Sequence, residues 1–336
     1  MIFSDPLNLY TTDNHLRPVD IRKDLDKIAD LIEICFSQTM DEDGKAYLRQ
    51  LRKSAEDARR LGWAASLVEE NQIPITGYVW EENDQIIGNL TLIPLKKYEE
   101  QIHLVANVAV LPQFRRKGIG EKLTRAAISY VQKKNYGSIW LQVRDDNPPA
   151  EQLYLNLGFI ERARRTTWHN FSGDPIPALT PGYEITSTSM ADWNKQERML
   201  ENIYPASVVW NLPVNIQKFK PTLISQFSKF FAGETHRSWA LRRNGELLGT
   251  LTWETARTWA DNLWVGTKLE YQETILSNLL PHAMGSLHRT QPQAINYPAG
   301  EAEAVFSRYG FKKHLTLIWM ELPGIKQEHS TLLASI

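Results

Sequence analysis

A basic run interrupted by glycines is the part of the sequence whose residue types most clearly suggest chemistry. It consists of Arg115, Arg116, Lys117, Gly118, Ile119 and Gly120. Glycines at the start of a helix let a ligand approach the main chain, and the free N–H groups there, helped by nearby cations, suit a phosphate or pyrophosphate. The alternative is a plain turn with a solvated basic face. The run contains neither a Rossmann fingerprint nor a P-loop.

The elements around this run follow from the pattern of apolar residues. An apolar strand precedes it from about His103 to Val110, and an apolar helical face follows it from Leu123 to Val131. A second strand, Ile139–Val143, leads to a helix that begins at Asn147-Pro148 and ends at Gly158. The chain therefore presents the loop between a strand and a helix, as an anion site requires.

Composition limits the classes of function. The chain has 336 residues, 42% of them hydrophobic, and a formal net charge of −1. This length favours about two domains, and the charge provides no overall field to hold nucleic acid or an anionic membrane. Cys35 is the one cysteine and falls on a helical apolar stripe, which indicates a buried small hydrophobe. With no secretory pattern and no apolar span, we expect a cytoplasmic protein.

The two halves of the chain repeat each other across a segment rich in proline and glycine. The hairpin pattern around Gly88 returns around Gly249, and the helix end at Gly158 returns at Gly310. We therefore expect an N-terminal extension at 1–13, a first domain at 14–169, a linker at 170–182, a second domain at 183–323 and a tail at 324–336.

Three segments in order resemble the GNAT superfamily of acyl-CoA-dependent N-acetyltransferases. They are Arg115-x-x-Gly118-x-Gly120 after an apolar strand, Ile139–Val143, and Asn147-x-x-Ala-x-x-Leu-Tyr154-x-x-Leu-Gly-Phe159. The resemblance covers residues 14–169 well and the second half in outline. It implies an α+β fold of two tandem GNAT-like domains, each a mixed sheet flanked by helices. It further implies that acetyl-CoA lies in a split between the fourth and fifth strands.

The resemblance also implies roles for particular residues. Val108, Ala109 and Val110 fall in the segment whose backbone meets the pantetheine arm and polarises the thioester carbonyl, and the basic loop falls on the pyrophosphate. Asn147 matches a position that contacts the cofactor, although it is equally suited to cap the following helix. Tyr154 matches the general acid that protonates the leaving thiolate, although its spacing also fits core packing.

A general base is less evident, and the second repeat has lost the key groups. Glu99, Glu100 and His103 stand near the expected place, but strand-end positions favour solvated roles, and Asn107 replaces a more convincing carboxylate. In the second repeat, Ala299 and Phe306 stand where the first has Asn147 and Tyr154, and no paired glycines precede its helix. We therefore expect one cofactor per chain.

These observations predict an N-acetyltransferase that moves an acetyl group from acetyl-CoA directly to a small-molecule or peptide amine, with the first domain catalytic. The second domain is expected to be structural or to shape the acceptor cleft. We expect no metal, no nucleic acid and no membrane partner, because histidine spacing and charge favour none of them. Two alternatives stay open: a non-enzymatic acyl-CoA sensor or interaction module, and a nucleotide-binding protein using the same loop.

Overall fold

A computed structural model describes residues 13–61, 76–97, 100–134, 137–171, 179–221, 235–256, 259–287 and 291–324. The chain forms two compact units. Unit 1 comprises Met1–Val143, Asn147–Glu161 and Met320–Ile336, and unit 2 comprises Arg144–Asp146 and Arg162–Trp319. In the described part of the chain, no helix combines the length and the apolar character needed to cross a membrane.

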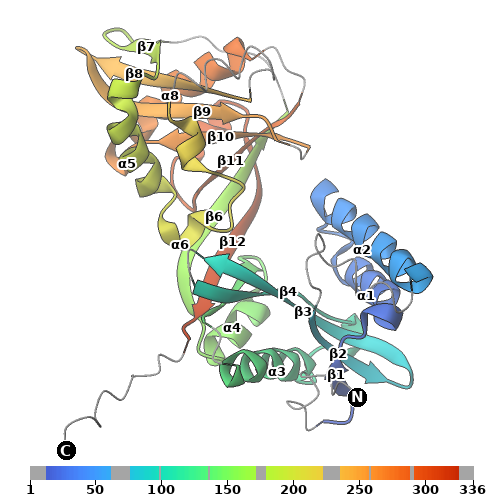
Figure 1. Ribbon diagram of the computed structural model, residues 1–336. Helices are drawn as coiled ribbons and strands as arrows, with labels where there is room; N and C mark the ends of the chain where they lie inside the picture. Colours follow the sequence, from blue (N-terminus) through green and yellow to red (C-terminus); the bar gives the residue numbers. More distant parts are fainter. Residues whose placement is uncertain are drawn as a thin grey trace, which may run out of the picture. The chain divides into compact units, whose positions relative to one another are not determined.

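Unit 1 is a mixed sheet with helices packed on it. Its strands lie in the order β1-β2-β3-β4-β5, and all neighbours are antiparallel except β4 and β5. The strands are β1 (Leu16–Pro18), β2 (Thr76–Glu82), β3 (Gln85–Lys97), β4 (Glu100–Val110) and β5 (Ile139–Arg144). The helices are α1 (Ile21–Phe36), α2 (Glu42–Leu61), α3 (Ile119–Lys133) and α4 (Pro148–Asn156). Helix α1 packs on β3 and β4, and α3 packs on β2, β3 and β4 (Figure 1).

Strands β4 and β5 separate part of the way along their length. They pair only from His103 opposite Ile139 to Val105 opposite Leu141, whereas β4 continues to Val110. The β3–β4 register also shifts in this stretch, and Asn107 there has a φ of 51°. An extra residue in one strand bends it away from its neighbour. The split expected between the fourth and fifth strands is therefore present.

The strands of unit 2 lie in the order β12-β6-β11-β10-β9-β8-β7, with β10 and β11 parallel and β9 antiparallel to β10. Its strands are β6 (Ile160–Asn170, from Arg162 on), β7 (Glu184–Ser187), β8 (His236–Arg243), β9 (Glu246–Glu254), β10 (Asp261–Gly266), β11 (Gln293–Pro298) and β12 (Lys312–Leu322, to Trp319). Its helices are α5 (Trp193–Ile203), α6 (Ala206–Val209), α8 (Gln272–Ser286) and α9 (Glu303–Arg308). The core is rich in tryptophan, and Trp239, Trp253 and Trp264 are buried in it.

The repeat seen in the sequence is a repeat of structure. The order β2-β3-β4-α3-β5-α4-β6 returns as β8-β9-β10-α8-β11-α9-β12. Gly88 and Gly249 serve the same purpose, because a Cβ on Gly88 would lie 2.9 Å from Ile119 and one on Gly249 would lie 2.3 Å from Ile275. Each glycine thus allows a helix to pack closely on its hairpin.

The compact units do not follow the boundaries of the sequence repeat. Residues 162–170, which the repeat assigns to the first domain, group with unit 2, where Arg165 to Asn170 of β6 pair with β11. The end of β12 groups instead with unit 1. Each unit therefore includes part of the last strand of the other repeat.

Candidate functional site

The basic loop joins β4 to α3 through a short 3-10 turn, η4 (Pro112–Phe114). Arg116 and Gly118 both have left-handed backbone conformations, with φ of 65° and 78°. Turns of this kind gather backbone N–H groups on a concave side that binds anions. Helix α3 begins at Ile119 without a side-chain cap, so the N–H groups of its first turn have no intrahelical acceptor. The loop thus carries the backbone donors that the sequence predicts.

The two glycines of the loop have different reasons to be there. Gly118 needs its positive φ, which side chains rarely adopt, although no atom lies within 4 Å of a Cβ built on it. Gly120 is helical, and a Cβ on it would meet only Leu153, at an ordinary 3.7 Å. The packing of the chain itself therefore leaves room for a side chain at Gly120. Open space over a helix N-terminus suits close approach by a ligand.

The positive charge of the loop is not neutralised. Arg115, Arg116 and Lys117 are exposed, and within the described residues none of them forms an ion pair with a carboxylate. Arg115 Nε donates to the carbonyl of Val110 at 3.0 Å, and Lys117 Nζ lies 5.0 Å from the centre of the Phe114 ring. The charge therefore remains available to an anion.

Cys35 lies beside the same carbonyl. Its Sγ donates to the oxygen of Val110 at 3.4 Å, and the residue is half-buried. Burial raises the pKa of the thiol, and the hydrogen bond from Arg115 only partly opposes this rise. The thiol is therefore neutral at physiological pH, which agrees with the structural role expected for it.

The end of β4 turns backbone groups toward the split. Leu111 N donates to the carbonyl of Ile87 in β3 at 2.9 Å, so the alternation of a strand directs the polar groups of Val110 away from β3. Ala109 pairs with Asn89 in β3 and is buried, and Val108 lies in the bulge where the β3–β4 register shifts. Of these three expected cofactor contacts, Val110 thus faces the side on which β5 has separated, although Arg115 and Cys35 already hold its carbonyl.

Helix α4 carries the two remaining expected residues. Asn147 is its N-cap, and Oδ1 accepts from Ala150 N at 3.4 Å. The structure thus shows the capping role, while Nδ2 has no acceptor among the described residues. Because Leu153 borders Gly120, the helix lies next to the loop.

Tyr154 is buried, with 6% of its surface exposed. Its ring packs edge-on against Phe159, with 5.8 Å between the ring centres, so the packing role holds. Within the described chain its hydroxyl has no hydrogen-bond partner, yet it is not among the fully enclosed unpaired atoms. Burial raises the pKa of Tyr154, so the phenol keeps its proton at physiological pH.

The family model described as "Acetyltransferase (GNAT) family" matches residues 34–159, which contain the loop, the split and both α4 residues. This stretch is a GNAT domain. Mycothiol acetyltransferase of Renibacterium salmoninarum is 41% identical over 98 residues, which are 28% of this chain and 29% of that protein. N-alpha-acetyltransferase of Sulfurisphaera tokodaii is 36% identical over 101 residues, 29% of this chain and 58% of that protein. The chain thus spans less than two thirds of either relative.

A solved structure supports the fold over most of the chain. The GCN5-related N-acetyltransferase from Sphaerobacter thermophilus aligns with a TM-score of 0.57 at 14% identity, covering 93% of this chain and 97% of that one. Identity this low speaks for the fold alone. It agrees with two mixed sheets, each flanked by helices, as expected from the sequence.

The GNAT domain has a polar cluster at the strand bulge that the sequence analysis did not assemble. Asn107 Nδ2 donates to the hydroxyl of Tyr47 in α2 at 2.8 Å. Asn89 is fully buried, and its Nδ2 donates to the carbonyl of Asn107 at 3.1 Å. The Oδ1 of Asn89 is enclosed without a partner among the described residues. In the sequence, this cluster is indicated only by two polar residues, Asn89 and Thr91, inside the apolar run of β3.

Of the residues considered for a base, the two that the structure describes do not lie at the open part of the split. Glu99 lies outside the described residues, and Glu100 is exposed at the start of β4. His103 is buried where β4 and β5 still pair, against Tyr130, and burial lowers its pKa. No carboxylate of the described chain is thus identified as a base, and Asn107 stands at the bulge.

In the second repeat, side chains of unit 2 fill the position that corresponds to the split between β4 and β5. Val265 pairs with Leu251 in β9 and so matches Val108. The hydroxyl of Tyr204 accepts from Val265 N at 3.2 Å. Arg165 lies over the Tyr204 ring, 5.1 Å from its centre, and burial lowers its pKa to about 10. The backbone donor that matches Val108 is therefore already occupied.

Proposed function

We propose that the chain is an N-acetyltransferase that moves the acetyl group of acetyl-CoA to a primary amine, and that the first repeat carries the reaction. The observation that carries the proposal is the loop of uncapped backbone donors and unpaired cations where β4 separates from β5. The curated relatives, which are named acetyltransferases, support the same chemistry.

In this proposal the chain's residues bind and orient the thioester. The N–H groups of residues 116–120, together with the side chains of Arg115, Arg116 and Lys117, hold the pyrophosphate. The N–H groups of Val108 and Val110 hold the pantetheine arm and stabilise the negative charge on the thioester oxygen. Asn147 contributes its free Nδ2 while its oxygen caps α4.

The transfer itself forms a C–N bond and breaks a C–S bond. A neutral amine attacks the thioester carbonyl, and the nitrogen releases its extra proton. Tyr154 gives its proton to the departing sulfur and recovers one from solvent, so that charge balances over the cycle. An amine has a pKa of about 10 in water, and desolvation at the split lowers it toward the neutral form. No metal takes part in this scheme.

The acceptor is proposed to be a small-molecule or peptide amine. One relative is named for mycothiol and the other for an N-alpha position, and both are named acetyltransferases. Neither nucleic acid nor a membrane is required as a partner, because the net charge of −1 provides no field for either.

The test is release of free thiol from acetyl-CoA in the presence of amines, aminoglycosides, polyamines, amino acids and peptides. We expect turnover with one of these classes and none with Gly118→Val, because that change disturbs the loop. The second candidate, an acyl-CoA sensor, is favoured by the absence of a carboxylate among the groups described at the bulge. Tight binding of coenzyme A with no acetylation of any acceptor would support the sensor instead.

A further inference from the structure

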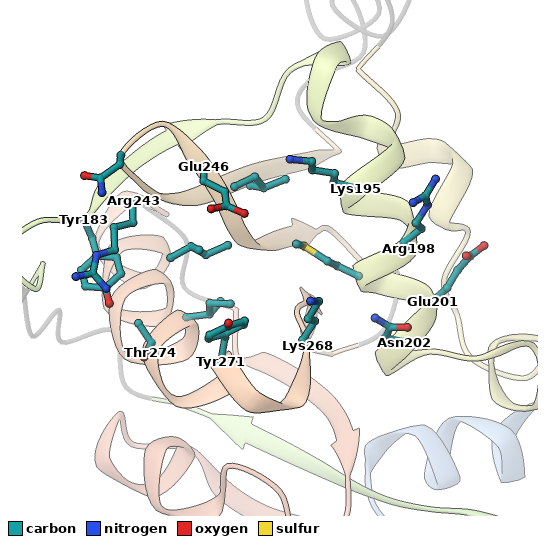
Figure 2. A pocket seen from close by; sticks show the side chains of 15 residues that line it. Tyr183, Lys195, Arg198, Glu201, Asn202, Arg243, Glu246, Lys268, Tyr271 and Thr274 are labelled. Atoms are coloured by element: carbon teal, nitrogen blue, oxygen red, sulfur yellow. The ribbon is translucent and has the colours of Figure 1, made fainter.

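Unit 2 contains a cavity of about 880 Å³. Three elements surround it: helix α5, the β8–β9 hairpin, and the connection from β10 to α8 (Figure 2). Its volume falls in the range of small-molecule sites, about 300 to 1,000 Å³. The cavity lies wholly within the second repeat and shares no residue with the proposed acetyl-CoA site.

The position of the cavity within the repeat is informative. The β10–α8 connection corresponds to the β4–α3 loop of the GNAT domain, and it has lost the paired glycines. Helix α8 begins after Tyr271 without a side-chain cap, and both Lys268 and Tyr271 line the cavity. Where the first repeat presents backbone donors, the second presents side chains around a hollow.

The charge around the cavity is predominantly positive. Its lining includes the four cations Lys195, Arg198, Arg243 and Lys268. The two anions in the lining are Glu201 and Glu246. Figure 2 shows Lys195, Lys268 and Glu246 directed into the hollow and Glu201 directed away from it. The excess of cations, two of them aimed inward, favours an anionic occupant.

These four cations make few strong interactions with other described residues. Lys268 Nζ lies 3.8 Å from Glu270, and both side chains are more than 60% exposed, so this pair contributes little. Arg243 lies over the Tyr183 ring, 5.6 Å from its centre. Among the described residues, Lys195 and Arg198 form no ion pair. A ligand would therefore meet charges that are already free.

The cavity also has an apolar lining below the charged side chains. Leu247 and Ile275 are buried, with 5% and 0% of their surfaces exposed, and they line the cavity together with Met199 and Leu248. Burying an apolar group of several carbons against this surface stabilises the complex. An inorganic anion would leave these apolar side chains in contact with water.

We propose that this cavity binds a small organic anion, a molecule with a carboxylate or phosphate head and an apolar body. Lys195 and Lys268 hold the head from opposite elements, and the body lies on Met199, Leu247 and Ile275. The site is independent of the acetyl transfer proposed for the first repeat.

The experiment is calorimetric titration of the full chain with n-hexyl phosphate, hexanoate and inorganic phosphate at low and high salt. We expect saturable binding of at least one hexyl probe, at least tenfold tighter than inorganic phosphate and weaker at high salt. The tighter of the two hexyl probes identifies the class of head group. No saturable binding of either hexyl probe overturns the proposal.

Three variants assign the site. The double variant Lys195→Gln, Lys268→Gln should weaken binding at least tenfold, and Lys312→Gln, an exposed cation of unit 2 outside the cavity, should bind as the unaltered chain does. Arg115→Gln should also leave binding unchanged, because it alters only the loop of the first repeat. Unchanged binding in the double variant, or equal loss in Arg115→Gln, overturns the proposal.

The apolar lining is tested separately. Met199→Gln should narrow the gap in affinity between n-hexyl phosphate and inorganic phosphate while leaving the affinity for inorganic phosphate unchanged. An unchanged gap contradicts the proposed place of the apolar body. Thermal unfolding of each variant confirms that the fold is retained. If the double variant unfolds at a lower temperature, Lys195→Gln or Lys268→Gln alone replaces it.

Discussion

The proposed reaction depends on single atoms whose surroundings differ between the two repeats. Tyr154 presents a hydroxyl that is unpaired among the described residues, and Phe306, at the matching position of the second repeat, has no hydroxyl. A buried phenol whose pKa is raised by desolvation stays protonated. It therefore meets the first requirement of a general acid, which is to hold its proton until the thiolate departs.

Removing that hydroxyl should separate binding from chemistry. For Tyr154→Phe we expect turnover to fall by about 10² to 10⁴, the usual contribution of a positioned acid, with the dissociation constant of acetyl-CoA within twofold of the original. The ring keeps its packing against Phe159, so thermal unfolding should change little. The measurement is steady-state thiol release alongside calorimetry, and normal turnover would exclude the acid role.

The two glycines of the loop should respond differently to alanine. Gly118→Ala places a side chain at a φ of 78° and should cost about 1 to 2 kcal/mol of unfolding free energy. Gly120→Ala meets only Leu153 at 3.7 Å and should raise stability by up to about 1 kcal/mol, because alanine favours a helix. Both should weaken coenzyme A binding.

Urea unfolding and calorimetry measure these two effects separately. Gly120→Ala is the informative variant, since it is expected to be more stable and yet to bind less well. If it binds coenzyme A as tightly as the original chain, the ligand does not approach the start of α3.

At the level of elements, a buried ion pair joins the start of helix α1 to the sheet of unit 1. Arg17 Nη1 and Nη2 lie 2.6 Å and 2.9 Å from the carboxylate of Asp24, and Arg17 Nε lies 2.6 Å from Glu81. Asp24 is fully buried and also accepts from Asp20 N at 2.7 Å. This arrangement fixes where α1 begins relative to β1 and β2.

Breaking the buried pair should cost much more than breaking an exposed one. Asp24→Asn should lower the unfolding free energy by about 3 kcal/mol, because the partly buried Arg17 loses the charge of its fully buried partner. Arg52→Gln, which removes pairs to Asp30 and Glu33 on exposed surfaces, should cost less than about 1 kcal/mol. Chemical denaturation measures both, and equal losses would contradict the distinction.

Elements could be predicted from sequence where neighbouring residues form the pattern. Gly88 and Gly249 lie in strand–turn–strand patterns, and the loop at 115–120 follows a run of apolar strand residues. The contact of Tyr47 with Asn107 joins residues 60 positions apart, and the bulge that brings them together depends on strand register. Neither leaves a local mark, so Asn89 and Thr91 within the apolar run of β3 could indicate a polar site there but not its contact with Tyr47.

At the level of the molecule, the two compact units are built from interleaved parts of the chain. The grouping of 162–170 with unit 2 depends on pairing between β6 and β11, more than 120 residues apart in the sequence. Repeat boundaries reflect duplication of a sequence, whereas compact units reflect which strands pair. This is why the repeat was visible in the sequence while the compact units were not.

The contact between Tyr204 and Val265 in the second repeat predicts how many acetyl-CoA molecules one chain binds. Because Tyr204 holds the N–H of Val265, we expect one molecule of acetyl-CoA per chain. Calorimetry should give a ratio of one, and Gly118→Val should remove the whole signal. Two molecules per chain, or a residual equivalent in the variant, would show that the second repeat still binds the cosubstrate.

The Tyr204 and Arg165 arrangement has a consequence for how this lineage can change. To bind the cosubstrate, the second repeat would have to lose the Tyr204 phenol, provide other contacts for the buried Arg165 guanidinium and regain a glycine turn before α8. Each step alone discards native contacts and returns no new activity, so selection opposes the first move. The second repeat would therefore regain a cosubstrate site only if all three changes occurred together.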